Sequence, residues 1–225
     1  MEEKKNVEQN LNTEELKKET VETVNQVKET IKNVDIKNDA KEATGFVTSM
    51  FKDPFGTIKT IVDDSNNKHF KTAIIFVAIW TIVVFIKALS LKFWSFDALF
   101  RNMLSLIKTI IAPALGILVL SGIIYFMNKE NKKSLVTIIT AVTTAKIPVI
   151  VASVVSLLTM FSVSAYKITT PFASLCSVVS VILTYFTAKN IFKEEQNSKF
   201  FKKFVAIEAI YYVAYILISF LEIYI

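Results

Sequence analysis

The chain has 225 residues, of which 52% are hydrophobic, and a formal net charge of +6. Residues 1–51 carry 8 Lys and 11 Asp or Glu, a net of −3, whereas residues 52–225 carry 18 Lys or Arg and 9 Asp or Glu, a net of +9. The second part holds several apolar runs of about 20 residues, which is typical of an integral membrane protein. Positive charge beside such runs indicates membrane topology and contact with a lipid bilayer, and it argues against nucleic acid as a partner.

Residues 1–43 form a polar tail with isolated apolar residues. Val21 and Val24 are three residues apart, and Val24 and Ile31 are seven apart, which gives a narrow stripe like that of a short coiled coil. One interpretation is a solvated, partly disordered cytoplasmic tail with transient helix. The other is an amphipathic helix that binds a protein partner.

Residues 44–71 form an amphipathic segment before the first span. Asp53-Pro54 predicts a helix start, with Asp as N-cap and Pro at the first helical position. We expect an interfacial helix on the cytoplasmic leaflet. The alternative is a soluble helix packed against the inner end of the bundle. For the interfacial helix, the candidate lipid contacts are Phe46, Phe51, Phe55, Lys52 and Lys59.

Five apolar segments predict an all-α fold, a polytopic membrane protein with five transmembrane helices. The predicted spans are about 72–90, 109–127, 135–161, 172–192 and 204–225, within a transmembrane domain of residues 72–225. Lysines gather before the first span and in the second and fourth loops. The positive-inside rule therefore predicts a cytoplasmic N-terminus and an outside C-terminus in the cell membrane, although the first loop also carries Lys92 and Arg101.

The third span, 135–161, is longer than a bilayer requires and contains Lys146 and Pro148 near its middle. As a helix it would measure about 40 Å, against a hydrocarbon core of about 30 Å. A lysine there costs about 2.5–3.5 kcal/mol on insertion scales. We expect Pro148 to bend the helix, and Thr144 to help satisfy the backbone at the bend.

Glu208 is the natural candidate partner of Lys146, because the third and fifth spans enter the membrane from the same side. The two residues, with Pro148 and Thr144, form a candidate polar region inside the membrane. Either it is an ion pair that sets the register of the helices, or it is a site for a ligand, a lipid headgroup or a proton.

Catalytic motifs are absent from the sequence. The only histidine is His69 and the only cysteine is Cys176, so that no pair of histidines and no intrachain disulfide can form. There is no nucleophile elbow, Walker A loop or dinucleotide-binding motif. We therefore expect no enzyme activity, no cofactor and no metal site.

The layout resembles the bacterial branch of the Yip1-domain family. The resemblance rests on the segment Asp53–Ile58 (Asp-Pro-Phe-x-Thr-Ile) before the first span, on five spans with short second and third loops, and on the proline in the middle of the third span. It covers about residues 52–225. The Asp-Leu-x-Gly-Pro and Gly-Tyr-Gly patterns of the eukaryotic members are missing. The resemblance implies a five-helix, non-catalytic membrane protein.

Two functions fit these features. The first is a membrane-organising or partner-binding protein, an adaptor or membrane-shaping factor, in which the segment 44–71 contacts lipid and the tail contacts a protein. The second is a small transporter or permease component that uses the polar region of Lys146 and Glu208. Because five spans without an evident inverted repeat are few for a complete carrier, the second function implies a homo- or hetero-oligomer.

Overall fold

The computed structural model describes residues 2–33, 35–64, 66–92, 103–128, 131, 133–193 and 197–221. The regular elements within these ranges are all helices, which confirms the predicted all-α class. In chain order they are α1 (Glu2–Lys32), α2 (Ile36–Lys52), α3 (Pro54–Asp63), α4 (Phe70–Lys92), α6 (Met103–Met127), α7 (Leu135–Ala145), α8 (Ile147–Val155), the 3-10 turns η1 (Ser156–Met160) and η2 (Val163–Ala165), α9 (Tyr166–Phe192) and α10 (Asn197–Leu221).

Three of these helices are long and apolar enough to cross a membrane, as expected for a membrane protein: α4 over Phe70–Leu89, α6 over Ile110–Met127 and α9 over Tyr166–Phe192. A fourth candidate is the pair Leu135–Ala145 and Ile147–Met160, which is bent by 44°. The predicted fifth span, 204–225, falls on α10 and on residues outside the described ranges. Among the described helices, α10 is not one of the three single candidates.

Several helices begin earlier than the apolar runs predict. The spans expected from residues 109, 172 and 204 belong to helices that start at Met103, Tyr166 and Asn197. Backbone hydrogen bonding continues through the polar residues that flank each run, and hydropathy does not detect those turns. As a result, Lys199, Lys202 and Lys203 lie on helical turns of α10 and not in the predicted fourth loop.

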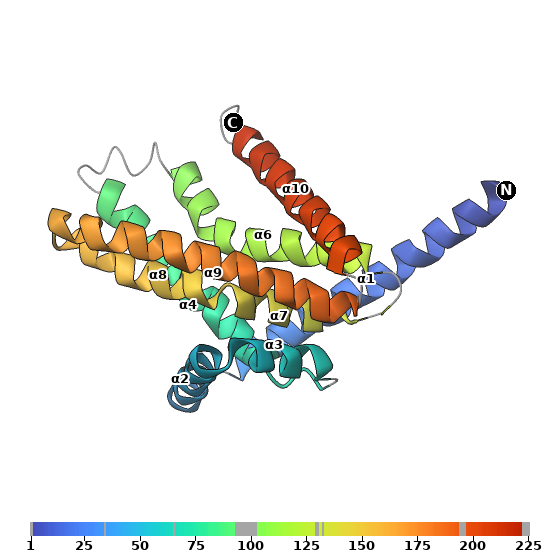
Figure 1. The fold of residues 1–225 in the computed structure, drawn as a ribbon, viewed down its shortest axis with the longest axis horizontal. Helices are drawn as coiled ribbons and strands as arrows, with labels where there is room; N and C mark the ends of the chain where they lie inside the picture. Colours follow the sequence, from blue (N-terminus) through green and yellow to red (C-terminus); the bar gives the residue numbers. More distant parts are fainter. Residues whose placement is uncertain are drawn as a thin grey trace.

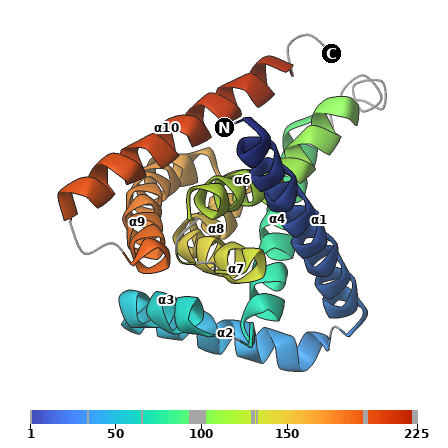
Figure 2. The same cartoon turned by 90° about the vertical axis from the view of Figure 1, so that its right-hand side faces the viewer.

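The centre of the bundle is α7. Every residue from Val136 to Ala145 is buried. Neighbouring helices α3, α4, α6 and α9 all pack against α7, as the end-on view shows (Figure 2). A helix without a lipid-facing side is unusual for a span, and it follows that protein surrounds this half of the predicted third span.

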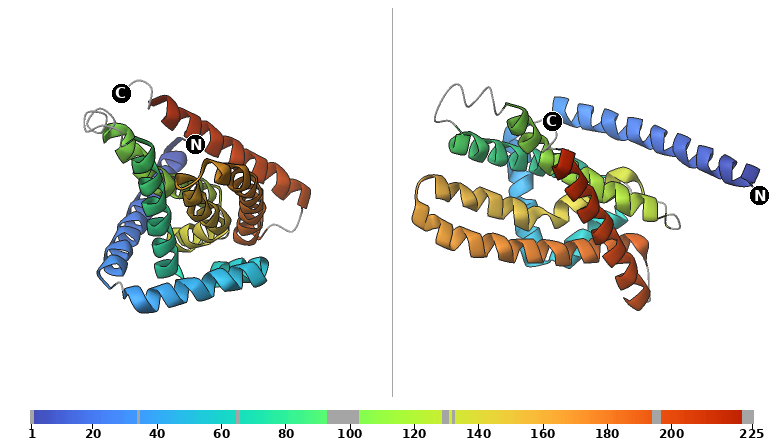
Figure 3. Two further views of the ribbon diagram at one scale, coloured as in Figure 1. Left: turned by 90° about the vertical axis from the view of Figure 1, so that its left-hand side faces the viewer. Right: turned by 90° about the horizontal axis from the view of Figure 1, so that it is seen from above.

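The other long helices lie around this centre. The second half of the bent pair, α8, runs beside α9, and η1 and η2 connect them at one end (Figure 1). Helix α10 contacts α6 and α9 and crosses the long helices at an angle (Figure 3). Exposed aliphatic side chains cover the outer faces of α4, α6, α9 and α10, as expected for surfaces in contact with lipid.

Helices α2 and α3 form a unit that we call the platform. Asp53 ends α2 and caps α3: its carboxylate accepts the backbone N–H of Gly56 at 2.9 Å, and Pro54 follows at the first helical position. The predicted helix start is thereby confirmed. A Cβ at position 56 would collide with the Asp53 carboxylate, so that another residue there would displace the capping side chain.

The platform lies along one side of the bundle, beside α7 and α9 (Figure 1), and the last turn of α3 reaches the end of the bundle where α6 and α9 finish and α7 begins. We call this the platform end. The Lys133 ammonium, just before α7, donates to the carbonyl of Val62 in α3 at 2.6 Å, and the Asn131 side-chain amide donates to the carbonyl of Phe192 at the end of α9. Apolar side chains of the platform enter the core there: Ala43, Phe46, Met50, Ile58, Ile61 and Val62.

Helix α1 takes up most of the segment predicted as a tail. The boundary predicted at residues 43 and 44 falls inside α2, which begins at Ile36 behind the N-cap Asp35. Near its middle α1 touches α4 and α7 through buried Thr23 and partly buried Val27, while its first turns extend away from the bundle (Figure 1). The Glu19 carboxylate accepts the backbone N–H of Leu135, the first residue of α7, at 3.4 Å.

A polar clasp joins α1, α2 and α4. The Lys71 ammonium forms an ion pair with Asp39 at 2.7 Å and donates to the carbonyl of Asn33 at 3.0 Å. Asp39 also accepts the backbone N–H of Asp35 at 2.8 Å. The hydrogen bond from Lys71 is the main reason why the pKa of Asp39 lies below its usual range.

Lowering the pH is expected to open this clasp. Because the pKa of Asp39 is depressed, its contribution is complete above the ordinary aspartate pKa of about 3.9 and is lost as the pH falls through the lower folded value. Asp39→Asn removes the charge at all pH values. We expect several-fold faster hydrogen exchange of the first-turn amides of α2 in this variant, without the acid-dependent step of the wild type. Exposed Glu42→Gln is the control, and equal exchange in the two variants would exclude the clasp.

Candidate functional site

The candidate site is centred on the break between α7 and α8, where Lys146 is the only residue between the two helices. Its backbone N–H donates to the carbonyls of Val142 at 3.2 Å and Thr143 at 3.0 Å, a tightened last turn for α7. Pro148 follows in the first turn of α8, without a backbone N–H to continue the ladder. The 44° bend confirms the expected effect of the proline.

The side chain of Thr144 forms a hydrogen bond to the backbone of α7. Its hydroxyl donates to the carbonyl of Thr140 at 2.8 Å, and the Thr140 hydroxyl donates to the carbonyl of Val136 at 2.8 Å. Such bonds to the preceding turn are common for hydroxyl side chains in membrane helices. Buried Thr144 therefore has a structural hydrogen bond, whereas the hydroxyl of neighbouring Thr143 has no hydrogen-bond partner among the residues that the structure describes.

The structure brings Lys146 and Glu208 near each other. Both side chains are partly buried, and they lie close enough for electrostatic attraction. These two described residues do not form a direct ion pair within 4.0 Å. Glu208 lies further along its helix than the sequence analysis predicts, because α10 begins at Asn197. It is 11 residues from that start, about 16 Å, and Lys146 is 12 residues from Ser134, about 18 Å.

The predicted lipid-contacting residues separate into two groups. Phe46 is not on the surface: it is 8% exposed, and its ring centroid lies 5.3 Å from that of His69 and 6.0 Å from that of Phe76. Packing against α4 places it in the core, and this corrects the expectation for Phe46. In contrast, Phe51 is 65% exposed, and Phe55, Lys52 and Lys59 are also exposed.

Phe55 occupies a position between the platform and the bundle. Its ring centroid lies 4.3 Å from that of Phe186 in α9. Phe186 is six residues before the end of α9, about 9 Å along the helix. At the other end of α3, the Lys133 ammonium lies 3.9 Å from an Asp63 carboxylate oxygen. Helix α3 therefore runs from the level where α7 begins to a level well inside α9.

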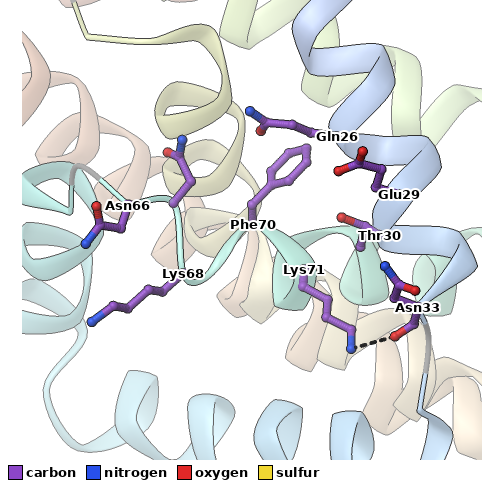
Figure 4. A pocket seen from close by; sticks show the side chains of 9 residues that line it. Gln26, Glu29, Thr30, Asn33, Asn66, Lys68, Phe70 and Lys71 are labelled. Atoms are coloured by element: carbon purple, nitrogen blue, oxygen red, sulfur yellow. Dashed lines mark hydrogen bonds between the residues drawn. The ribbon is translucent and has the colours of Figure 1, made fainter.

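Sequence reasoning did not find the polar cavity between α1 and the turn before α4. It has a volume of about 340 Å³ and holds both charge signs (Figure 4). Backbone N–H groups of Asn66 and Lys68 bind the Asp64 carboxylate in this turn, and these bonds, that of Asn66 above all, hold the pKa of Asp64 below its usual range. The lining residues are Gln26, Glu29, Thr30, Asn33, Asn66, Asn67, Lys68, Phe70 and Lys71.

A second group of residues was also missed, namely buried polar side chains that have no hydrogen-bond partner within the described ranges. Seven residues separate Ser180 from Thr187 on one face of α9, and seven separate Ser121 in α6 from Asn128 just after its end. This spacing is visible in the sequence. Serines and threonines in spans are commonly packing residues, however, and only the structure shows which hydroxyls find a partner.

The chain matches no protein-family model, no curated protein and no solved structure in the comparisons made. Within the described ranges, no three His, Cys, Asp or Glu side chains come together in a group that could hold a metal ion. The candidate site is thus assigned by its geometry alone.

A double-mutant cycle tests whether Lys146 and Glu208 interact. Lys146→Leu and Glu208→Leu each leave one charge in a partly apolar region, whereas the double variant leaves none. We expect a coupling of roughly 1 kcal/mol in thermal unfolding in nanodiscs, small because the groups are not in direct contact. Lys167, exposed in the first turn of α9, gives the control cycle with Glu208, which should be additive. Additivity in the first cycle would exclude the interaction.

Proposed function

We propose that this chain is a non-catalytic membrane protein of five spans that organises the membrane and holds a protein partner at its platform end. The fifth span is α10, whose residues 204–221 are apolar apart from a few polar side chains such as Glu208. The platform end faces the cytoplasm in the cell membrane, because Lys133, Lys193, Lys199 and Lys202 lie there or in the adjoining turns.

The platform is the observation that carries this proposal. Its apolar face is fixed to the bundle by Phe46, Met50 and Ile58, so that it cannot leave the membrane surface. Its outer side still presents Phe51 and Phe55 beside lysines. The contact of Phe55 with Phe186 puts the first turn of α3 about 9 Å inside the end of α9, and Asp63 at the other end of α3 lies beside Lys133, so that α3 covers roughly the 5–10 Å to which interfacial helices bury their apolar face.

The proposal therefore combines the two alternatives for residues 44–71, an interfacial helix and a helix packed against the inner end of the bundle. One face of the platform packs against protein, and the flank with Phe51 lies against the headgroup boundary. Lys52 and Lys59 then meet anionic headgroups, each worth about 1 kcal/mol near such a surface. A rigid wedge of this kind at one leaflet is how the chain would shape or sort the membrane.

Depth-dependent fluorescence quenching tests the lipid contact. In a chain with Trp80 and Trp94 replaced by Phe, the variant Phe51→Trp is expected to be quenched by brominated lipids at least about twofold more than Glu42→Trp. Residues 42 and 51 are nine positions apart in α2 and point in opposite directions, and both are exposed. Equal quenching of the two tryptophans would exclude an interfacial platform.

The partner surface of this proposal is the exposed stripe of α1. Val21, Val24 and Ile31 are 59%, 46% and 60% exposed, while Thr23 and Val27 face the bundle. Three apolar residues at spacings of three and seven on a solvated helix suit a helical partner bound in the manner of a short coiled coil.

Substitution of this stripe tests the partner proposal. Val21→Ser, Val24→Ser and Ile31→Ser together leave the bundle contacts of α1 intact and should abolish in-cell cross-linking of α1 to its partner. The control is Asn25→Ser with Lys28→Ser, which changes exposed polar positions of the same helix. Cross-linking that survives the apolar substitutions but not the control would contradict the proposal.

A second candidate function is a transporter or permease component, and the broken third span favours it. Half-helices that meet near the middle of a membrane form the substrate sites of many transporters. The Lys146→Leu variant separates the two functions. A membrane-organising protein retains its activity on vesicles in this variant, whereas a transporter loses flux.

The resemblance to the bacterial Yip1-domain proteins belongs to the same proposal. Its support is the cap at Asp53 and Pro54 and the bend at Pro148. A membership in that family would agree with a non-catalytic role.

A further inference from the structure

The polar cavity between α1 and α4 is bordered by a group of side chains without partners. Gln26, Glu29 and Thr30 project from α1 toward Phe70 at the start of α4 (Figure 4). Among the described residues, none of these three side chains has a hydrogen-bond or ion-pair partner. The Thr30 hydroxyl differs in this from that of Thr23 in the same helix, which donates to the carbonyl four residues earlier at 2.7 Å. Three polar groups are therefore available to a ligand.

The orientation of α1 brings these groups to the bundle. A helix on a protein surface usually turns its apolar side inward. In α1 the exposed stripe contains Val24 and Ile31, and Gln26 and Glu29 are each two residues from one of them, about 160° around the helix. The polar side of α1 thus lines a cavity of about 340 Å³ against α4. This volume is near the lower end of the roughly 300–1,000 Å³ of small-molecule sites, so it suits a small ligand or a headgroup.

The charges of the cavity favour a cation next to α1. The Lys71 ammonium is neutralised by its ion pair with Asp39 at 2.7 Å and also donates to the carbonyl of Asn33. Lys68 extends away from α1, on the other side of Phe70 (Figure 4). The carboxylate of Glu29 has no such partner, and it faces the cavity between these two lysines and its own helix. A positively charged group in front of Glu29 would complete its ion pair.

The set of acceptors matches a primary ammonium. Gln26, Glu29 and Thr30 occupy positions i, i+3 and i+4, which are neighbours on the helix surface. They offer three oxygen acceptors, one of them charged, and a primary ammonium has three N–H donors. Ca²⁺ and Mg²⁺ take about six or more oxygen ligands, so that one carboxylate and two neutral oxygens are a poor set for either metal. The Phe70 ring provides an apolar wall for the carbon atoms that carry the ammonium.

The cavity lies where the apolar runs of two helices begin. Asn67, which lines it, accepts the hydroxyl of Thr137 at 3.0 Å, and Thr137 is the third residue of α7. The apolar run of α4 starts at Phe70. If α4 crosses the membrane, the cavity is therefore within about one helical turn of the hydrocarbon, at the level of the lipid headgroups. An ammonium can reach this level from a lipid headgroup or from the aqueous phase.

We infer that this cavity binds the primary ammonium of a phosphoethanolamine group, which Glu29, Gln26 and Thr30 hold beside the ring of Phe70. Lys68, on the side of the cavity away from α1, suits the phosphate of the same group. The group is either a soluble compound or the headgroup of an ethanolamine phospholipid. The site does not depend on whether the chain organises a membrane or transports a solute.

Thermal unfolding of the full chain in phosphatidylcholine nanodiscs tests this inference, because a ligand that binds the folded chain raises its Tm. In one arm, phosphoethanolamine is titrated against phosphocholine, which has three methyl groups in place of the three N–H donors. In the other arm, phosphatidylethanolamine replaces part of the phosphatidylcholine. The variant is Glu29→Gln, and the control is Glu22→Gln, an exposed position of α1 that does not line the cavity.

We expect a rise in Tm for the wild type and for Glu22→Gln, and at least about tenfold weaker binding by Glu29→Gln, which corresponds to about 1.4 kcal/mol. Stabilisation in the first arm shows that a soluble compound suffices, and stabilisation in the second arm alone identifies the lipid headgroup. The inference is overturned if neither arm raises the Tm, if phosphocholine acts equally, or if Glu29→Gln responds like the wild type. Thr30→Val, which removes one acceptor, decides if Glu29→Gln does not fold.

Discussion

The burial of α7 on all sides is the constraint on which the rest of the structure depends. In a membrane, a span usually presents one side to lipid, because lipid is as apolar as the side chains that face it. Here all of Val136–Ala145 is enclosed by protein. Small and β-branched residues dominate this stretch, and they allow neighbouring helices to approach closely. Four threonines in it would be costly in lipid but are tolerated inside a protein shell.

The long helices alone do not enclose α7, because two helices that precede the first span also pack against it. Helices α4, α6 and α9 contact it, and α3 and α1 contact it as well. The segment before the first span is thus part of the shell around α7, which explains why Ile58, Ile61 and Val62 are among the most buried residues of the chain. The platform is therefore packed against α7 as directly as the long helices are, and it is part of the protein shell that holds the break after α7.

The sequence predicts the features that depend on local chemistry. The cap at Asp53 and Pro54, the apolar runs of α4, α6 and α9 and the bend near Pro148 all follow from short-range rules. Features that depend on neighbours escaped prediction. Phe46 and Phe51 are both phenylalanines of the same amphipathic segment, and only the position of α4 decides that the first is buried and the second exposed. Helix starts were placed too late, because lysine-rich turns read as loops.

The candidate site also combines a residue that the sequence predicts, Lys146, with a pattern of burial that it does not predict. The pattern of burial explains the position of Lys146. Lys146 lies at the point of the third span where the buried side chains change from partly hydroxylic to apolar. Before it, α7 carries Thr137, Thr140, Thr143 and Thr144, and after it the buried residues of α8 are apolar. A lysine inside a membrane is stable where it has water or a counter-charge, and this one has partly buried Glu208 beside it without a direct ion pair. The bend at Pro148 then marks the boundary between a half of the span whose buried side chains include four threonines and a half whose buried side chains are apolar.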